Sequence, residues 1–154
     1  MSRCCLILLV LSLIINCGSK PYYHPIKSRF SDSDKNKLKY VSKGYLGVPY
    51  RYGGTGKHGF DCSGFVYRVY SDALNRKLPR TTKGLFKASY DISVSQAQTG
   101  DLVFFRIKSG KLDHVGMMLN KSGFIHTSKS RGVVVSYLGE DYYWKRFAGI
   151  RRLR

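Results

Sequence analysis

The chain changes its hydrophobic periodicity once, near residue 101, and this change limits the folds open to it. Before that point apolar residues recur at helical spacing, most clearly over residues 62–74. Five short segments follow that are rich in β-branched and aromatic residues and bounded by turn residues: 102–107, 114–119, 123–128, 133–138 and 147–153. Helices followed by strands predict one α+β domain whose strands form an antiparallel meander.

The helical half contains two further expected helices and one loop. Asp32 or Ser33 is expected to cap a helix that reaches about Leu46. Asp61, a residue type preferred at N-caps, stands directly before the clearest helical segment. A short helix is expected near residues 82–89. Ahead of Asp61, closely spaced glycines exclude a regular element and predict a shaped loop: Gly53, Gly54, Gly56 and Gly59.

The N-terminus has the pattern of an export signal. A basic residue is followed by a run of about 12 apolar residues, whereas a bilayer crossing takes about 20. The run ends at Asn16 and Cys17, and a cysteine in this place resembles the lipidated cysteine of bacterial lipoproteins. Asn16 departs from that pattern, so a plain signal peptide is the alternative. We expect a signal peptide over 1–16, a tether over 17–31 that begins at lipidated Cys17, and a folded domain over 32–154.

The charge of the chain narrows the choice of partners. Lys and Arg number 27 against nine Asp and Glu, which gives a net charge of +18 and favours a polyanionic partner or surface. The basic residues are scattered from Lys20 to Arg154 and are not clustered on one helix that could read base edges. This distribution argues against nucleic-acid binding. An exported lipoprotein meets anionic lipid and carboxylate-rich cell wall instead. The 43% hydrophobic content excludes a disordered chain.

One cysteine is left without a partner once the signal is removed. Cys4 and Cys5 leave with the signal and Cys17 takes the lipid, so Cys62 is the remaining thiol. Exported domains usually pair their cysteines, and an unpaired one is either an apolar filler or a reactive group. Glycines nearby leave Cys62 approachable, and a helix N-terminus favours a thiolate, although the carboxylate of Asp61 acts against it. The pattern favours a nucleophile with a lowered pKa.

A cysteine nucleophile needs a base, and four histidines are candidates. His24 lies in the tether, and His58 lies in the glycine-rich loop, which would hold a base poorly. His114 and His126 lie on consecutive expected strands, twelve residues apart. A three-residue turn at 120–122 would place both on one face of the hairpin, whereas a four-residue turn would separate them.

The other face of that hairpin then forms a core. With the three-residue turn, Gly116 opposes the second histidine and leaves room for its ring. The face turned away from the histidines carries four apolar residues: Val115, Met117, Leu119 and Ile125. The hairpin is therefore expected to have one apolar face for the core and one face that carries the two histidines.

Six short motifs follow one another within residues 35–153. They are VPYRYGG (48–54), DCSGFV (61–66), LPRT (78–81), GDLV (100–103), HVG (114–116) and FIH (124–126). In this order they resemble the NlpC-type papain-like cysteine peptidases of bacterial cell walls. The resemblance implies a papain-like α+β fold in which the nucleophile opens a helix that packs on an antiparallel sheet.

The resemblance also implies roles for individual residues. Cys62 would be the nucleophile, His114 its base, His126 the group that orients the base, and Tyr50 a stabiliser of the oxyanion. Three residues would line the substrate cleft: Asp61, Ser63 and Arg80. The family often has a glutamine where this chain has Leu85, which bears on substrate detail more than on catalysis. No cofactor and no metal are implied.

These observations predict a monomeric hydrolase of peptidoglycan stem peptides. The bond could be D-alanyl–diaminopimelate or D-glutamyl–diaminopimelate. Gly18-Ser19 lacks the aspartate that retains lipoproteins at the inner membrane, so the lipid anchor is expected in the outer membrane, facing the periplasm. Three alternatives stay open: an amidase or acyltransferase on the same scaffold, a non-catalytic basic wall-binding lipoprotein, and a metal site at the cysteine and histidines, which lacks local ligand spacing.

Overall fold

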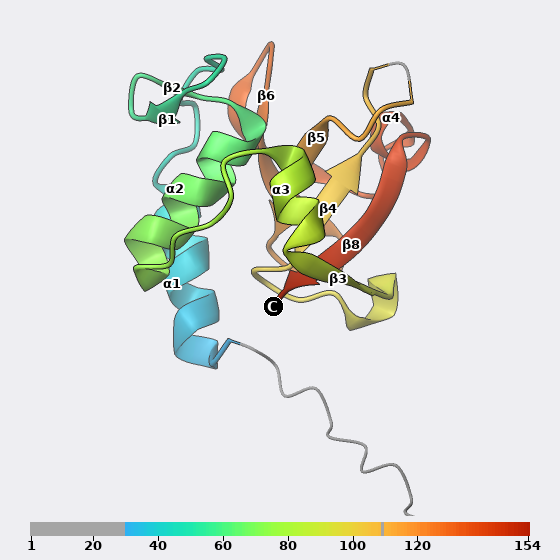
Figure 1. Ribbon diagram of the computed structural model, residues 1–154, viewed down its shortest axis with the longest axis horizontal. Coiled ribbons are helices and arrows are strands. Elements are labelled where there is room, and N and C mark those ends of the chain that lie inside the picture. Colours follow the sequence, from blue (N-terminus) through green and yellow to red (C-terminus); the bar gives the residue numbers. More distant parts are fainter. Residues whose placement is uncertain (1–29, 109) are drawn as a thin grey trace, which may run out of the picture.

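A computed structural model describes residues 30–108 and 110–154 (Figure 1). The expected signal peptide, the lipidation of Cys17 and most of the tether lie outside these residues and stay predictions. Helices occupy the first half of the described chain and strands most of the second half, so the predicted α+β class is confirmed. None of the helices in the described ranges is long and apolar enough to cross a bilayer.

The described residues contain four α-helices (Figure 1): α1 (Asp32–Lys43), α2 (Cys62–Leu74), α3 (Thr82–Lys87) and α4 (Asp141–Trp144). Of these, α1 packs against α2. The bounds of α2 and its Asp61 cap are those predicted. The expected cap of α1 was wrong, because Ser31 is the N-cap and forms a capping box with Asp34. The same helix ends three residues earlier than expected, and α4 was not foreseen, since its four residues show too little periodicity.

Six strands form one sheet: β3 (Ser89–Ile92), β4 (Leu102–Phe105), β5 (His114–Met118), β6 (Gly123–Ser128), β7 (Gly132–Tyr137) and β8 (Phe147–Leu153). Their order is β3-β8-β4-β5-β6-β7, and all neighbours are antiparallel. The predicted meander is correct for β4 to β7. It is wrong for β8, which returns across the sheet and pairs between β3 and β4.

The glycine-rich loop contains a regular element after all. Thr55–Gly56 (β1) and Gly59–Phe60 (β2) pair as a minimal antiparallel ladder. The glycines are needed here for close approach, because a Cβ at Gly54 would overlap the carbonyl oxygen of Gly59. A Cβ at Gly64, in the first turn of α2, would overlap the carbonyl oxygen of Gly54. This compact hairpin therefore lies directly against the start of α2.

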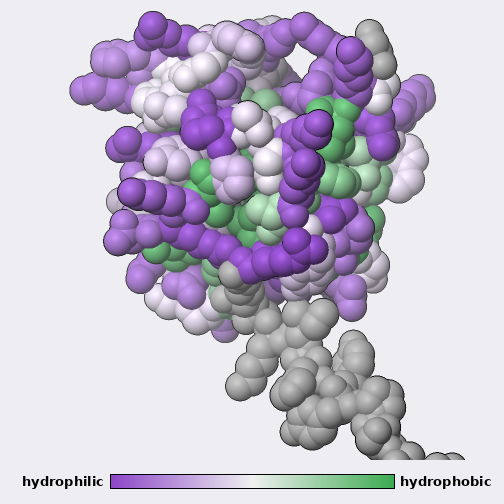
Figure 2. Space-filling model, in the orientation of Figure 1, coloured by the Kyte–Doolittle hydropathy of each residue, from purple (hydrophilic) through white to green (hydrophobic). Residues whose placement is uncertain are grey.

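The sheet has an apolar cluster on each side. On one side, α2 buries Phe65, Val66 and Val69 in a cluster that contains Val115 and Met117 of β5. On the other side, a smaller cluster gathers the opposite faces of the same strands beneath α4. Figure 2 shows hydrophilic residues over most of the visible surface, in keeping with the scattered positive charge. The larger cluster packs α2 against β5, which lies in the middle of the sheet.

Candidate active site

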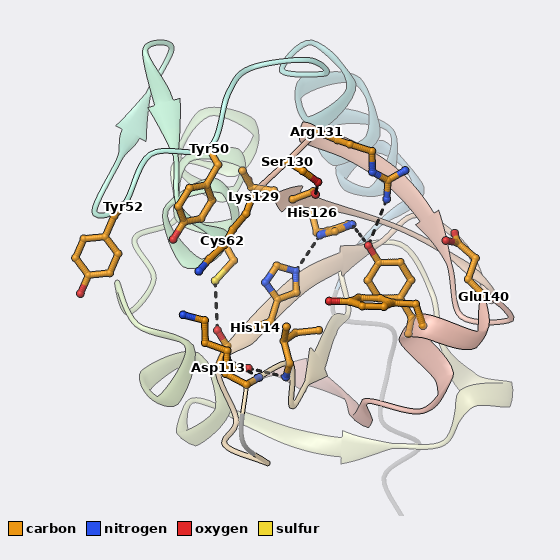
Figure 3. Close-up of a pocket in the computed structure, with 16 residues that line it drawn as sticks. Tyr50, Tyr52, Cys62, Asp113, His114, His126, Lys129, Ser130, Arg131 and Glu140 are labelled. Atoms are coloured by element: carbon orange, nitrogen blue, oxygen red, sulfur yellow. Dashed lines mark hydrogen bonds between the residues drawn. The ribbon is translucent and has the colours of Figure 1, made fainter.

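A pocket of about 650 Å³ opens where α2, β5, β6 and the segment before β1 meet. Its walls include Tyr50, Cys62, Asp113, His114, His126 and Lys129 (Figure 3). The predicted nucleophile, base and orienting histidine thus share one pocket with the predicted oxyanion tyrosine. These four residues come from four separate segments: the loop before β1, the start of α2, β5 and β6.

The predicted hairpin register accounts for the pairing of the histidines. Met117 pairs with Ile125, and the Leu119 N–H donates to the Gly123 carbonyl over 2.9 Å, so the turn has three residues as predicted. The Asn120 side chain holds this turn by accepting from the Gly123 N–H over 2.7 Å. The predicted core face is confirmed, because all four of its apolar residues lie in the cluster beneath α2.

His114 and His126 are hydrogen-bonded to each other. The distance from His114 Nε2 to His126 Nδ1 is 2.9 Å, and the ring planes are 89° apart. Gly116 provides the space, since a Cβ there would lie 3.1 Å from the His126 Cβ. The bond occupies one ring nitrogen of His114 and leaves Nδ1 for another partner.

Burial keeps both imidazoles neutral. It lowers the pKa of His114 to about 4, with Lys129 acting in the same direction and Asp113 against it. Burial also lowers the pKa of His126 to about 3, with further lowering from His114 and Arg131. At neutral pH each ring therefore carries a single proton, and the position of that proton decides which nitrogen can act as a base.

The surroundings of His126 offer acceptors for a proton on its Nε2. His126 Nε2 lies 3.1 Å from the Tyr143 hydroxyl and 3.4 Å from the Ser136 hydroxyl, both of which can accept a hydrogen bond. The Arg131 guanidinium approaches the same two oxygens at 3.5 Å. A proton on His126 Nε2 leaves its Nδ1 as an acceptor for the His114 Nε2–H. His114 Nδ1 is then unprotonated and is able to accept a proton.

Cys62 is the first residue of α2, and its sulfur faces two polar groups. Sγ lies 3.7 Å from the Thr82 hydroxyl and 3.8 Å from the Asp113 carbonyl oxygen. The expected lowering of the thiol pKa was wrong for this structure. Burial raises the pKa of Cys62 and outweighs the opposing effects of Thr82 and of nearby backbone N–H groups, while Asp61 raises it further.

The comparisons with known proteins agree with this arrangement. The NlpC/P60 family pattern matches residues 47–152. The chain belongs to the NlpC/P60 family. It is 39% identical over 154 residues to the probable endopeptidase NlpC of Escherichia coli K12, covering 98% of this chain and 99% of that protein. The predicted family is confirmed.

Two further relatives extend the comparison. Over 110 residues the chain is 43% identical to the murein DD-endopeptidase/LD-carboxypeptidase MepS of E. coli K12, covering 71% of this chain but 57% of MepS. The crystal structure of an NLP/P60-family protein similar to lipoproteins from Staphylococcus aureus superposes with a TM-score of 0.72 at 32% identity. That match covers 80% of this chain and 42% of the other. The predicted fold is confirmed, and both E. coli relatives are endopeptidases by name, MepS a murein endopeptidase and NlpC a probable endopeptidase.

The three predicted cleft residues of this NlpC/P60 domain form a cluster of their own. Asp61 caps α2 by accepting from the Gly64 N–H over 2.6 Å. The Ser63 hydroxyl lies 3.0 Å from Asp61 Oδ1 and 2.8 Å from the Arg80 carbonyl oxygen, and the Arg80 guanidinium pairs with Asp61 at 3.4 Å. None of the three is among the residues that line the pocket. Their role in substrate binding stays a prediction.

Two other positions that the sequence singled out lie away from the chemistry. Leu85, which replaces the family glutamine, is fully buried in the core beneath α2. His58 is exposed in the β1–β2 turn and does not line the pocket. In the described ranges, no group of three His, Cys, Asp or Glu residues is arranged to hold a metal ion.

Several groups that surround the cysteine and the histidines of this NlpC/P60 domain were not predicted from the sequence: Thr82, Lys129 and Tyr143. Thr82 directly follows the LPRT motif, and its place after a known motif could have pointed to it. Tyr143 and Lys129 gave no such signal, because α4 and the β6–β7 turn have no distinctive pattern. Only the folded chain brings these two residues to the histidines.

Proposed function

We propose that this protein is a cysteine peptidase that hydrolyses peptide bonds in peptidoglycan stem peptides or their crosslinks. Cys62 is the nucleophile, His114 its base, and His126 the group that orients the base. One observation carries the proposal: a reachable thiol and a hydrogen-bonded histidine pair face the same open pocket. Family membership and the endopeptidase names of the relatives support the substrate class.

The resting site is neutral, which sets the order of the steps. The pKa of the thiol is raised and that of His114 is lowered, so the thiolate–imidazolium pair is disfavoured before substrate binds. The thiol therefore transfers its proton to His114 Nδ1 as sulfur attacks the peptide carbonyl. The Cys62 backbone N–H and the Tyr50 hydroxyl stabilise the oxyanion that forms.

The second half of the reaction uses the same proton. His114 gives it to the leaving amine as the carbon–nitrogen bond breaks, which leaves an acyl group on the sulfur. His114 then deprotonates a water molecule that attacks the thioester. As the carbon–sulfur bond breaks, His114 returns that proton to the sulfur, which releases the carboxylic acid and restores the thiol. His126 acts through His114 in both halves by keeping Nδ1 free.

The cellular setting is part of the proposal. A signal peptide over 1–16 would direct the chain to the cell envelope, and lipid on Cys17 would anchor a monomer, with the tether over 17–31 leading to the catalytic domain. The names of the relatives support a place at the bacterial cell wall. An anchor in the outer membrane, facing the periplasm, would put the pocket within reach of peptidoglycan.

Mass spectrometry of digested sacculi tests the proposal. Purified sacculi are incubated with the wild-type protein and with Cys62→Ala, and the new termini are identified by mass. We expect new termini at D-alanyl–diaminopimelate or D-glutamyl–diaminopimelate bonds with the wild type alone. Products that contain a new amide or ester in place of a free carboxylate would indicate an acyltransferase. Equal products from both proteins would refute the role of the thiol.

A further inference from the structure

One wall of the pocket carries positive charge that the proposed reaction does not use. Lys108, on the segment after β4, and Lys129, at the β6–β7 turn, both line the pocket together with the thiol. The Lys129 ammonium lies 5.8 Å from the centre of the Tyr50 ring, at the distance of a cation–π contact. Figure 3 shows the Lys129 side chain extending past Tyr50 toward Cys62.

The acidic groups of the same pocket are already engaged by backbone. The Asp113 carboxylate accepts from the N–H groups of Ile107 and Lys108 over 2.8 and 3.1 Å, which fixes the segment that carries Lys108. The Glu140 carboxylate accepts from the Tyr137 N–H over 2.7 Å. Within residues 30–108 and 110–154, neither lysine forms an ion pair with a carboxylate.

The fold holds these two cations close together. Both side chains line the same pocket, and the proximity of Lys108 lowers the pKa of Lys129, while Asp113 and Cys62 act in the opposite direction. Two like charges at short range repel one another, and an anion placed between them removes that repulsion and adds two attractions. The electrostatic energy of the two lysines is therefore lower with an anionic ligand between them than without one.

We propose that Lys108 and Lys129 form a subsite for a carboxylate of the substrate residue that adjoins the scissile bond. This inference rests on the proposed function. Diaminopimelate adjoins both candidate bonds and carries a carboxylate that is not part of the peptide backbone and remains free in the stem peptide. The ammonium groups lie in the same pocket as the reacting thiol, so they would hold this residue while the neighbouring carbonyl is attacked. The two lysines would determine specificity without taking part in proton transfer.

Binding to an inactive variant tests the subsite independently of catalysis. Isothermal titration calorimetry of the Cys62→Ala protein uses two probes: the tripeptide L-alanyl-γ-D-glutamyl-diaminopimelate, and the same peptide with both diaminopimelate carboxylates amidated. Lys108→Met and Lys129→Met are then added together in the Cys62→Ala background. The matched control, Lys77→Met with Lys121→Met, removes the same two charges from exposed positions outside the pocket.

We expect the pocket variant to bind the acid peptide about tenfold more weakly, from roughly threefold for each solvent-exposed ion pair. Its affinity for the amidated peptide should not change, and the control variant should bind both peptides like the parent. Unchanged binding of the acid peptide would overturn the subsite. Equal losses for both peptides would also overturn it, because the lysines would then act on something other than the carboxylate.

The same proteins separate this inference from the proposed function. If the protein with Cys62 intact cleaves neither peptide nor sacculi, the proposed function fails, whatever the binding data show. If the protein with Cys62 intact cleaves both peptides with equal KM, and the lysine variant binds the acid and the amidated peptide as the parent does, the subsite alone fails. Added salt should weaken binding of the acid peptide more than that of the amide, since exposed ion pairs are screened.

Discussion

Tyr143→Phe tests the arrangement of protons proposed for the histidine pair. His114 can accept a proton at Nδ1 only while its Nε2–H donates to His126, and this requires the His126 proton to be on Nε2. The Tyr143 hydroxyl is the nearest acceptor for that proton, at 3.1 Å. The substitution keeps the buried ring, which packs against Phe105 and Phe124, and removes only the oxygen. Tyr143 is therefore a positioning residue in this scheme.

The size of the effect of Tyr143→Phe on kcat depends on the acceptor that remains for the His126 proton. The Ser136 hydroxyl lies 3.4 Å from His126 Nε2 and can still accept, so the first substitution weakens the preference without abolishing it. Groups that orient metal-bound imidazoles contribute about 10- to 100-fold, and by analogy we expect the lower end for this histidine pair, about tenfold in kcat. Adding Ser136→Ala would leave a buried N–H without a side-chain acceptor, which costs about 1–3 kcal/mol and favours the inactive tautomer.

Steady-state kinetics on purified muropeptides measures the change. We expect kcat to fall and KM to stay constant, because the removed hydroxyl contacts His126 and the ring that lines the pocket is retained. Nitrogen NMR of the imidazoles in the Cys62→Ala background should show His126 protonated at Nε2, and a shift toward Nδ1 in the double variant with Ser136→Ala. Tyr137→Phe, at an exposed tyrosine of β7, is the control. Wild-type kcat in the double variant, or a rise in KM alone, would refute the reasoning.

Four further outcomes are expected. His114→Asn should abolish hydrolysis of sacculi while His126→Asn retains a measurable rate, since an amide can still accept from His114 but cannot replace the base. His58→Ala should match the wild type. Loss of activity in His58→Ala together with activity in His114→Asn would mean that the base is misassigned. The acid limb of kcat/KM should lie near pH 4, because burial lowers the pKa of His114 to about 4 and the base stays unprotonated above it; a limb near pH 6.5 would contradict that burial effect. Iodoacetamide should alkylate Cys62 more slowly than a free cysteine at pH 7, with a rate that rises to higher pH, because burial raises its pKa; faster alkylation at pH 7 would show that the helix N-terminus dominates. Cys17→Ala should move the protein from membranes to the soluble periplasmic fraction, and unchanged fractionation would point to another anchor.

Local patterns predicted the parts of the site that depend on short stretches of chain. The bounds of α2 followed from its apolar spacing and from Asp61 as its cap. The shared face of His114 and His126 followed from turn length alone, because side chains alternate along a strand and a three-residue turn preserves their face. Such inferences need no knowledge of distant contacts.

Contacts between distant segments could not be predicted in the same way. The pairing of β8 between β3 and β4 joins segments about 50 residues apart, and no local pattern specifies it. The same holds for Tyr143 on α4, which meets His126 across 17 residues. Lys129 and Lys108 come from different turns that line the same pocket, and the Asp113 carboxylate fixes the segment that carries Lys108.

The charge state of Cys62 shows why position in the sequence and burial have to be weighed together. The sequence places the sulfur at the N-terminus of α2, where backbone N–H groups favour the thiolate. Folding also surrounds it with Thr82, the Asp113 carbonyl and the pocket wall, and the loss of water outweighs the favourable N–H groups. Because His114 is also neutral for the same reason, the charged pair in the proposed mechanism forms only as sulfur bonds to the substrate carbon. The base is then required in the first chemical step, so loss of His114 cannot be compensated by a thiolate that already exists.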